Sequence, residues 1–148
     1  MKNKIEIPLE KTNLLLPVIK FFLPNSDEPY YGIIDSGSEI TLMDDKFILN
    51  NKNLFKIHID DTVQTTVGIS NDNGTELNIN VQGDIIVNSK SITLDSYVAP
   101  LAHLSEQCKS IGDNIIISAL IGIDTLLKYN CVLSVKDKKL ILYDICSK

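Results

Sequence analysis

The sequence predicts a single all-β domain, either a barrel or a sandwich, over residues 1–148. A chain of 148 residues has the length of one ordinary domain, and its 44 % apolar residues can form a core. Ile and Val recur in short runs, and these β-branched residues favour strands. Turn residues interrupt the runs about every eight to twelve positions, which is typical of all-β folds.

The expected strands are short apolar or alternating segments between turn residues. They cover Ile5–Leu9, Leu14–Leu23, Tyr30–Ile34, Ile57–Ile59, Thr62–Ile69, Glu76–Val81, Asp84–Val87, Ser91–Val98, Ile115–Ile121, Cys131–Val135 and Lys139–Tyr143. Asn73-Gly74 joins two alternating segments and predicts a hairpin turn, because both residues tolerate positive φ. Two short helices are expected, Leu101–Lys109 and Asp124–Tyr129, the second capped by the carboxylate of its first residue.

The charge balance argues against a nucleic-acid-binding protein. The chain has 14 basic residues, all of them lysines, against 19 acidic ones, for a net charge of −5. Nucleic-acid-binding surfaces are usually basic, and they use the guanidinium group of Arg to grip phosphates and guanines. We therefore expect no nucleic-acid partner.

Membrane insertion and secretion are not expected either. The longest apolar stretch, Leu14–Leu23, is interrupted by Pro17 and Lys20, and a spanning helix needs about 20 apolar residues. Residues Met1–Lys11 contain no apolar signal region. These features predict a cytoplasmic protein, although a mature chain that has lost its leader would have the same features.

No metal site or disulfide framework is expected. The three cysteines, Cys108, Cys131 and Cys146, are odd in number and lack Cys-x-x-Cys spacing, so we expect buried free thiols. His58 and Asp60 would share one face of a strand, but no third ligand lies nearby in the sequence.

The most informative segment places a carboxylate directly after an apolar strand. Tyr30–Ile34 leads into Asp35-Ser36-Gly37-Ser38. A carboxylate at the end of a buried strand is costly unless hydrogen bonds support it. Ser36 and Ser38 offer hydroxyl donors, and Gly37 allows a tight turn with an accessible amide. Such a loop could present Asp35 to a cleft, although a simple capped turn would use the same residues.

Asp35-Ser36-Gly37-Ser38 after an apolar pair resembles the active-site signature of aspartic proteases. A second element, Leu120-Ile121-Gly122, resembles the apolar-apolar-Gly segment that packs beneath the catalytic loop in these enzymes. The separation of the two elements suits the single-lobe, homodimeric retropepsin-like branch, and the resemblance covers Leu14 to Tyr143. It implies a closed or partly open β-barrel with one or two short helices and a flap hairpin.

The resemblance implies an aspartic endopeptidase, a hydrolase that acts on a peptide or protein substrate without a metal or organic cofactor. The reaction needs two carboxylates that share a proton, and the chain has one such loop. The implied enzyme is therefore a homodimer in which an Asp35 from each copy activates the attacking water. We expect an acidic working pH, favoured by a hydrogen bond from the Ser38 hydroxyl to the carboxylate.

The resemblance also implies how a substrate is held. Gly37 would offer main-chain contacts below an extended peptide, and Gly68–Gly74 would form the flap tip above it, with Gly68, Ile69 and Ser70 as substrate contacts. This tip is more polar than the Gly-rich tips of retroviral enzymes.

The sequence departs from the retroviral pattern at the dimer contact as well. Ile123 stands where retroviral enzymes commonly have an Arg that ties the dimer together, so we expect the terminal strands Ile5–Leu9 and Lys139–Tyr143 to hold it. Two alternatives stay open. One is a catalytically silent retropepsin-fold dimerisation or peptide-binding module, and the other is a monomeric β-barrel domain with no active-site role.

Overall fold

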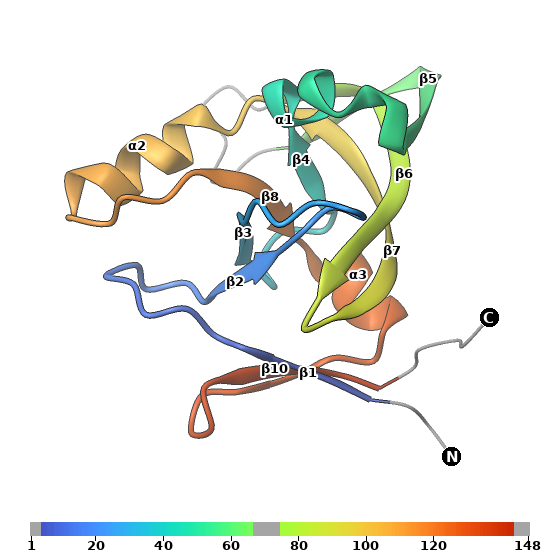
Figure 1. Ribbon diagram of the computed structural model, residues 1–148. Coiled ribbons are helices and arrows are strands. Elements are labelled where there is room, and N and C mark those ends of the chain that lie inside the picture. Colours follow the sequence, from blue (N-terminus) through green and yellow to red (C-terminus); the bar gives the residue numbers. More distant parts are fainter. Residues whose placement is uncertain (1–3, 67–74, 144–148) are drawn as a thin grey trace.

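The computed structural model describes residues 4–66 and 75–143 and is mostly β-structure (Figure 1). In chain order its elements are β1 (Ile5–Pro8), β2 (Val18–Phe21), β3 (Tyr30–Ile34), β4 (Leu42–Asp44), α1 (Asp45–Asn50), the 3₁₀ helix η1 (Lys52–Leu54), β5 (Phe55–Thr66), β6 (Thr75–Val87), β7 (Lys90–Ala99), α2 (Ala102–Ser110), β8 (Ile117–Ile121), α3 (Ile123–Lys128), β9 (Val132–Ser134) and β10 (Lys139–Leu142).

These strands form two sheets. The larger has the order β2-β3-β8-β4-β7-β6-β5, and the smaller has the order β1-β10-β9. Two neighbouring pairs in the larger sheet, β3 with β8 and β4 with β7, are parallel, whereas the other pairs are antiparallel. Figure 1 shows the smaller sheet below the larger one, on the side of α3. The parallel pair β3 and β8 lies inside the larger sheet, which suits strands that are buried on both faces.

The larger sheet curls back on itself without closing. The end of β2 meets β6 at an isolated bridge, where Phe22 N donates to Ile86 O at 2.9 Å and Ile86 N donates to Phe22 O at 2.7 Å. The resemblance implied a barrel that is either closed or partly open. The described strands therefore form a partly open one.

Contacts among four aromatic rings pack α1 against the larger sheet. The Phe47 ring of α1 lies 4.8 Å from Tyr30, 5.9 Å from Phe21 and 6.0 Å from Phe55, measured between ring centroids. All three contacts are edge-on, the geometry that aromatic quadrupoles favour. Phe47 is 5 % exposed, so these rings form a continuous part of the core.

A second apolar cluster lies beneath α2 and buries the other face of β3 and β8. Leu104 and Cys108 of α2 pack in this cluster with Val18, Ile33 and Leu120. All five residues of β8 are buried. No helix among the described residues is long and apolar enough to cross a membrane.

The described cysteines agree with the expectation of free thiols. Cys108 is buried and Cys131 is half-buried, and neither is in a disulfide. Burial raises the pKa of the Cys131 thiol to about 11, so it is protonated and unreactive at neutral pH. Cys146 lies outside the described residues.

Several sequence-based boundaries were wrong. The segment 42–54 contains β4, α1 and η1, where no strand or helix was expected. The Asp44 carboxylate caps α1 by accepting from Phe47 N at 3.3 Å. The strand expected over Leu14–Leu23 is limited to β2, and α3 begins one residue before its expected cap, Asp124.

Replacing Phe47 with alanine should lower the free energy of unfolding by about 3–5 kcal/mol, because the change leaves a cavity between α1 and the sheet. Leu49→Ala, on the same helix but 68 % exposed, is the matched control and should change stability by about 0.5 kcal/mol or less. Urea denaturation measures both. Equal losses for the two variants would contradict this account of the core.

Candidate active site

Asp35 lies directly beyond the end of the buried parallel pair β3 and β8. Its backbone N donates to Ile121 O at 2.9 Å, which continues the hydrogen-bond ladder between the two strands by one residue. The residue itself is half-buried. The ladder therefore fixes the backbone of Asp35 while part of the residue remains accessible.

A tight turn over residues 35–38 sets the orientation of the carboxylate. Ser38 N donates to Asp35 O at 3.1 Å, and Gly37 N donates to Asp35 Oδ1 at 3.0 Å. A Cβ atom on Gly37 would lie 3.2 Å from Asp35 Oδ1, so a larger residue would crowd the carboxylate. Ser36 is exposed at the tip of this turn.

Gly122 lies against the loop that carries Asp35. A Cβ atom at this position would come within 2.5 Å of Ile40 O and 2.9 Å of Ser38 O. Both obstacles are backbone atoms, so only glycine fits without shifting the loop. The next residue, Ile123, donates its N–H to Ser38 O at 2.8 Å and joins the start of α3 to the turn.

A polar network centred on the fully buried Thr41, which directly precedes β4, joins Gly122 to the first turn of α3. Thr41 Oγ1 donates to Asp124 Oδ1 at 2.7 Å and accepts from Gly122 N at 3.1 Å. Thr125 Oγ1 lies 2.5 Å from Thr41 Oγ1, and it is the donor of this pair because the Thr41 proton already points to Asp124. The second carboxylate oxygen, Asp124 Oδ2, accepts from Thr41 N at 3.1 Å.

Sequence reasoning missed Thr41 and placed Asp124 too early in the helix. Asp124 was expected to be the N-cap of α3, but Gly122 has that position. From within the first turn, the Asp124 carboxylate accepts the Thr125 N–H at 2.8 Å and also both the backbone N–H and the hydroxyl of Thr41. The available signal was a polar residue between Ile40 and Leu42, in a segment that is otherwise apolar. Thr41 is fully buried, and a buried hydroxyl needs partners.

The expected hydrogen bond from Ser38 to the Asp35 carboxylate was also wrong. Ser38 Oγ donates to Ile40 O at 2.8 Å instead. The turn points the hydroxyl along the chain toward β4, where the carbonyl of Ile40 is the acceptor. Ser38 therefore stabilises the loop rather than the carboxylate.

Among the described residues, Asp35 takes part in no ion pair. The ion pairs found there, from Lys4 and Lys139 to Glu6, lie on the smaller sheet. No group of three or more His, Cys, Asp or Glu side chains in this part of the chain could hold a metal ion. Within the described ranges, the Asp35 carboxylate accepts a hydrogen bond from the Gly37 amide and is not neutralised by a lysine.

Of the hairpin that was expected to form a flap, the structure describes two antiparallel strands, with a register shift between Ile59 and Gln64. β5 and β6 pair antiparallel from Phe55 opposite Gly83 to Thr66 opposite Thr75. The expected flap tip, Gly68–Gly74 with the candidate substrate contacts Gly68, Ile69 and Ser70, lies outside the described residues.

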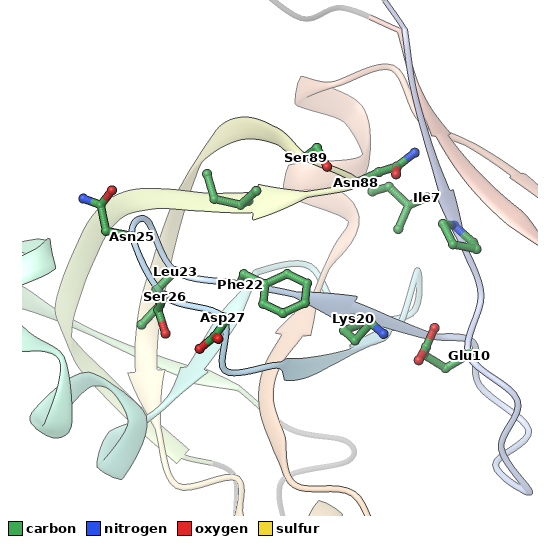
Figure 2. A pocket seen from close by; sticks show the side chains of 12 residues that line it. Ile7, Glu10, Lys20, Phe22, Leu23, Asn25, Ser26, Asp27, Asn88 and Ser89 are labelled. Atoms are coloured by element: carbon green, nitrogen blue, oxygen red, sulfur yellow. The ribbon is translucent and has the colours of Figure 1, made fainter.

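A cavity of about 870 Å³ opens elsewhere, between β1, β2 and the turn after β6. Figure 2 shows the Phe22 ring near its centre, with Lys20 and Glu10 toward one end and the turn residues 25–27 toward the other. None of the described residues that the sequence singled out as candidate site residues lines this cavity. It is a separate feature from the Asp35 loop.

No protein-family model and no curated protein matches the chain. Solved structures, in contrast, are similar to the chain. The crystal structure of the retroviral protease-like domain of Ddi1 from Leishmania major is similar with a TM-score of 0.59 and 13 % sequence identity, over 90 % of this chain and 92 % of that one. A retropepsin-like aspartic protease from Rickettsia conorii is similar with a TM-score of 0.52 and 13 % identity, over 97 % of this chain and 92 % of that one. The chain therefore has the retropepsin-like fold.

Replacing Thr41 with valine should destabilise the protein by about 1–3 kcal/mol, because the buried amide of Gly122 loses its acceptor. It should also speed hydrogen exchange at the Gly122 amide. Thr41→Ser keeps the hydroxyl and is the matched control, with an expected cost of about 1 kcal/mol for the lost methyl group. Urea denaturation and amide exchange measure these effects. If Thr41→Val is as stable as Thr41→Ser and the Gly122 amide exchanges no faster in it, the network does not support the loop.

Proposed function

We propose that the chain is an aspartic endopeptidase that hydrolyses peptide bonds as a homodimer, with Asp35 of each copy at the twofold axis. The observation that carries this proposal is the Asp35 carboxylate itself. It follows a buried parallel strand pair, is oriented by the Gly37 amide and has no lysine partner among the described residues. The retropepsin-like fold adds support, because solved proteins of this fold include an aspartic protease.

The chemistry explains why two copies are needed. Two carboxylates close together share one proton, because both cannot ionise at such a short distance. The ionised carboxylate takes a proton from a water molecule while that water attacks the peptide carbonyl carbon. The protonated carboxylate gives its proton to the carbonyl oxygen. As the C–N bond breaks, the dyad gives one proton to the amide nitrogen and takes one back from a hydroxyl group of the tetrahedral intermediate. The products are a carboxylic acid and an amine, and the dyad again holds one proton.

Substrate binding would use the surroundings of the same turn. Gly37 and the exposed Ser36 lie beside the Asp35 carboxylate, where an extended peptide could meet main-chain groups. The β5–β6 hairpin would cover the peptide from the other side and exclude water during the reaction. A peptide or protein substrate is therefore proposed, with no metal or organic cofactor.

Wild-type protein should cleave a mixed peptide library at acidic pH, and Asp35→Asn should abolish cleavage, because an amide cannot accept the proton from water. The assay should run from about pH 3 to about pH 7, so that it includes pH values at which the dyad holds one proton. Asp45→Asn, a change at an exposed carboxylate in the first turn of α1, is the matched control and should retain activity.

Two results would speak against the peptidase, and a third would invalidate the assay. Cleavage that survives Asp35→Asn would show that another group or a contaminant is responsible. Loss of cleavage in Asp45→Asn with intact folding would mean that the assay does not report on Asp35. If folded wild-type protein cleaves no peptide at any pH but binds peptides with measurable affinity, the peptide-binding module would be favoured.

A further inference from the structure

We propose that a pocket between α1, α2 and the start of β8 binds an organic cation, that is, an ammonium or guanidinium group on an apolar stem. The pocket has a volume of about 770 Å³. We call it the α1–α2 pocket and define it by six of its lining residues, which are Glu28, Tyr30, Tyr31, Asp44, Glu106 and Ile116. The proposed binding needs neither Asp35 nor a second copy of the chain, so it goes beyond the proposed peptidase.

The α1–α2 pocket lies at the opposite end of β3 from the candidate active site. Tyr30 and Tyr31 are the first two residues of β3, whereas Asp35 follows the last one. Five residues of strand span about 16 Å, so the Asp35 carboxylate is well away from the pocket. None of the residues 35–38 of the Asp35 turn lines it. The pocket is therefore a separate site.

Hydrogen bonds among the residues around the pocket hold its walls in place. The Asp44 carboxylate accepts from Phe47 N at 3.3 Å and from Leu101 N at 2.9 Å, which ties α1 to the residue that precedes α2. The Ser105 hydroxyl of α2 accepts from Ile117 N at 2.8 Å, which ties α2 to β8. The pocket is thus preformed, and a ligand would not have to order its walls on binding.

The charged side chains of the pocket favour a cation. Three carboxylates line it, those of Glu28 before β3, Asp44 at the end of β4 and Glu106 on α2. Among the described lining residues, Lys46 is the one basic side chain, so three negative charges against one positive charge leave a net charge of −2. Neither Glu28 nor Glu106 takes part in an ion pair within the described ranges. Their charges are therefore available to attract a cationic ligand.

The arrangement of these carboxylates suits an organic cation better than a metal ion. A metal site needs several ligands around one point, and no group of three or more His, Cys, Asp or Glu side chains among the described residues could hold a metal. Both oxygens of Asp44 already accept backbone hydrogen bonds. The negative charge is thus spread around the pocket, as a larger cation requires.

Aromatic and aliphatic side chains supply the rest of the recognition. The Tyr30 ring lies 4.8 Å from the Phe47 ring, measured between centroids, and the Tyr30 hydroxyl donates to Glu28 Oε2 at 3.2 Å. Burial and the nearby charge of Glu28 raise the pKa of Tyr30, so this ring is partly desolvated beside a carboxylate. Cations bind over the faces of aromatic rings, and desolvation strengthens the attraction. Ile116, which is 73 % exposed, offers an apolar surface to the stem of the ligand.

The larger cavity in Figure 2 lacks this combination. Its charged lining residues are Glu10, Lys20 and Asp27, and Phe22 is its one aromatic residue among the described residues. Charges of both signs with a single ring do not select a cation as clearly as the α1–α2 pocket does.

Titration of the full chain with phenethylammonium at neutral pH, followed by NMR of the backbone amides, tests the proposal. A molecule of this size should bind with a Kd on the order of 1 mM and should shift the amide signals of Tyr31, Ser105 and Ile116. 2-Phenylethanol has the same ring and stem without the charge, so it should bind at least about 10-fold more weakly. A capped Ile-Arg-Ile peptide, with Ile-Gln-Ile as its neutral counterpart, tests a peptide side chain as the source of the cation. Asp35→Asn protein is used with the peptides, so that cleavage does not consume them.

Variants of exposed lining residues should change the affinity in opposite directions. The double variant Glu28→Gln, Glu106→Gln should weaken the binding of phenethylammonium by about 10-fold, because two attractive charges are lost. Lys46→Gln removes a repulsive charge and should tighten binding by about 3-fold. Glu39→Gln, at an exposed carboxylate that does not line the pocket, is the matched control and should leave the Kd unchanged. All four positions are exposed, so the variants keep the fold.

Charge-dependent binding of either probe with these amide shifts supports the proposal. Binding of the peptide alone identifies a side chain of a partner protein as the source of the cation, and binding of phenethylammonium alone identifies a free amine. Absence of binding of both probes up to about 10 mM would contradict the proposal. Equal affinity for the charged and neutral probes, or an unchanged Kd in the double variant, would contradict it as well. These results do not depend on whether wild-type protein cleaves peptides, because the pocket does not include Asp35.

Discussion

The structure depends on a backbone constraint: the turn that carries Asp35 is held from two sides at once. The end of β8 accepts the Asp35 amide through Ile121 O, and the start of α3 donates to Ser38 O through Ile123. The two contacts lie on either side of Gly122, whose missing Cβ lets the chain pass against the turn. These contacts fix the backbone that carries the Asp35 carboxylate, which is the preorganisation that the proposed catalysis would need.

The sequence was sufficient to predict the fold class and the Asp35 loop. It was not sufficient to predict the contacts that hold this loop in place. The Asp35 loop and Gly122 carry a local signature, since backbone demands select glycine and turn residues at fixed positions. The Thr41 and Asp124 partnership joins residues far apart in the chain, and no local pattern encodes such a contact. The helix α1 was missed because its strongest feature, the aromatic contacts of Phe47, is tertiary.

In the proposed enzyme the site is split between two copies, which would make assembly part of the mechanism. Each chain would contribute one carboxylate, so the active fraction would follow the population of dimer and would rise with protein concentration. Retroviral enzymes commonly have an arginine at the dimer contact. This chain contains lysines but no arginine, and it has Ile123 at that position.

The most direct test of the central claim is a crystal structure of the dimer. The account predicts that a twofold axis passes between two Asp35 side chains and that their nearest carboxylate oxygens lie about 3 Å apart, close enough to share a proton. A dimer in which the two Asp35 side chains point away from each other, or are each paired with a lysine, would contradict it.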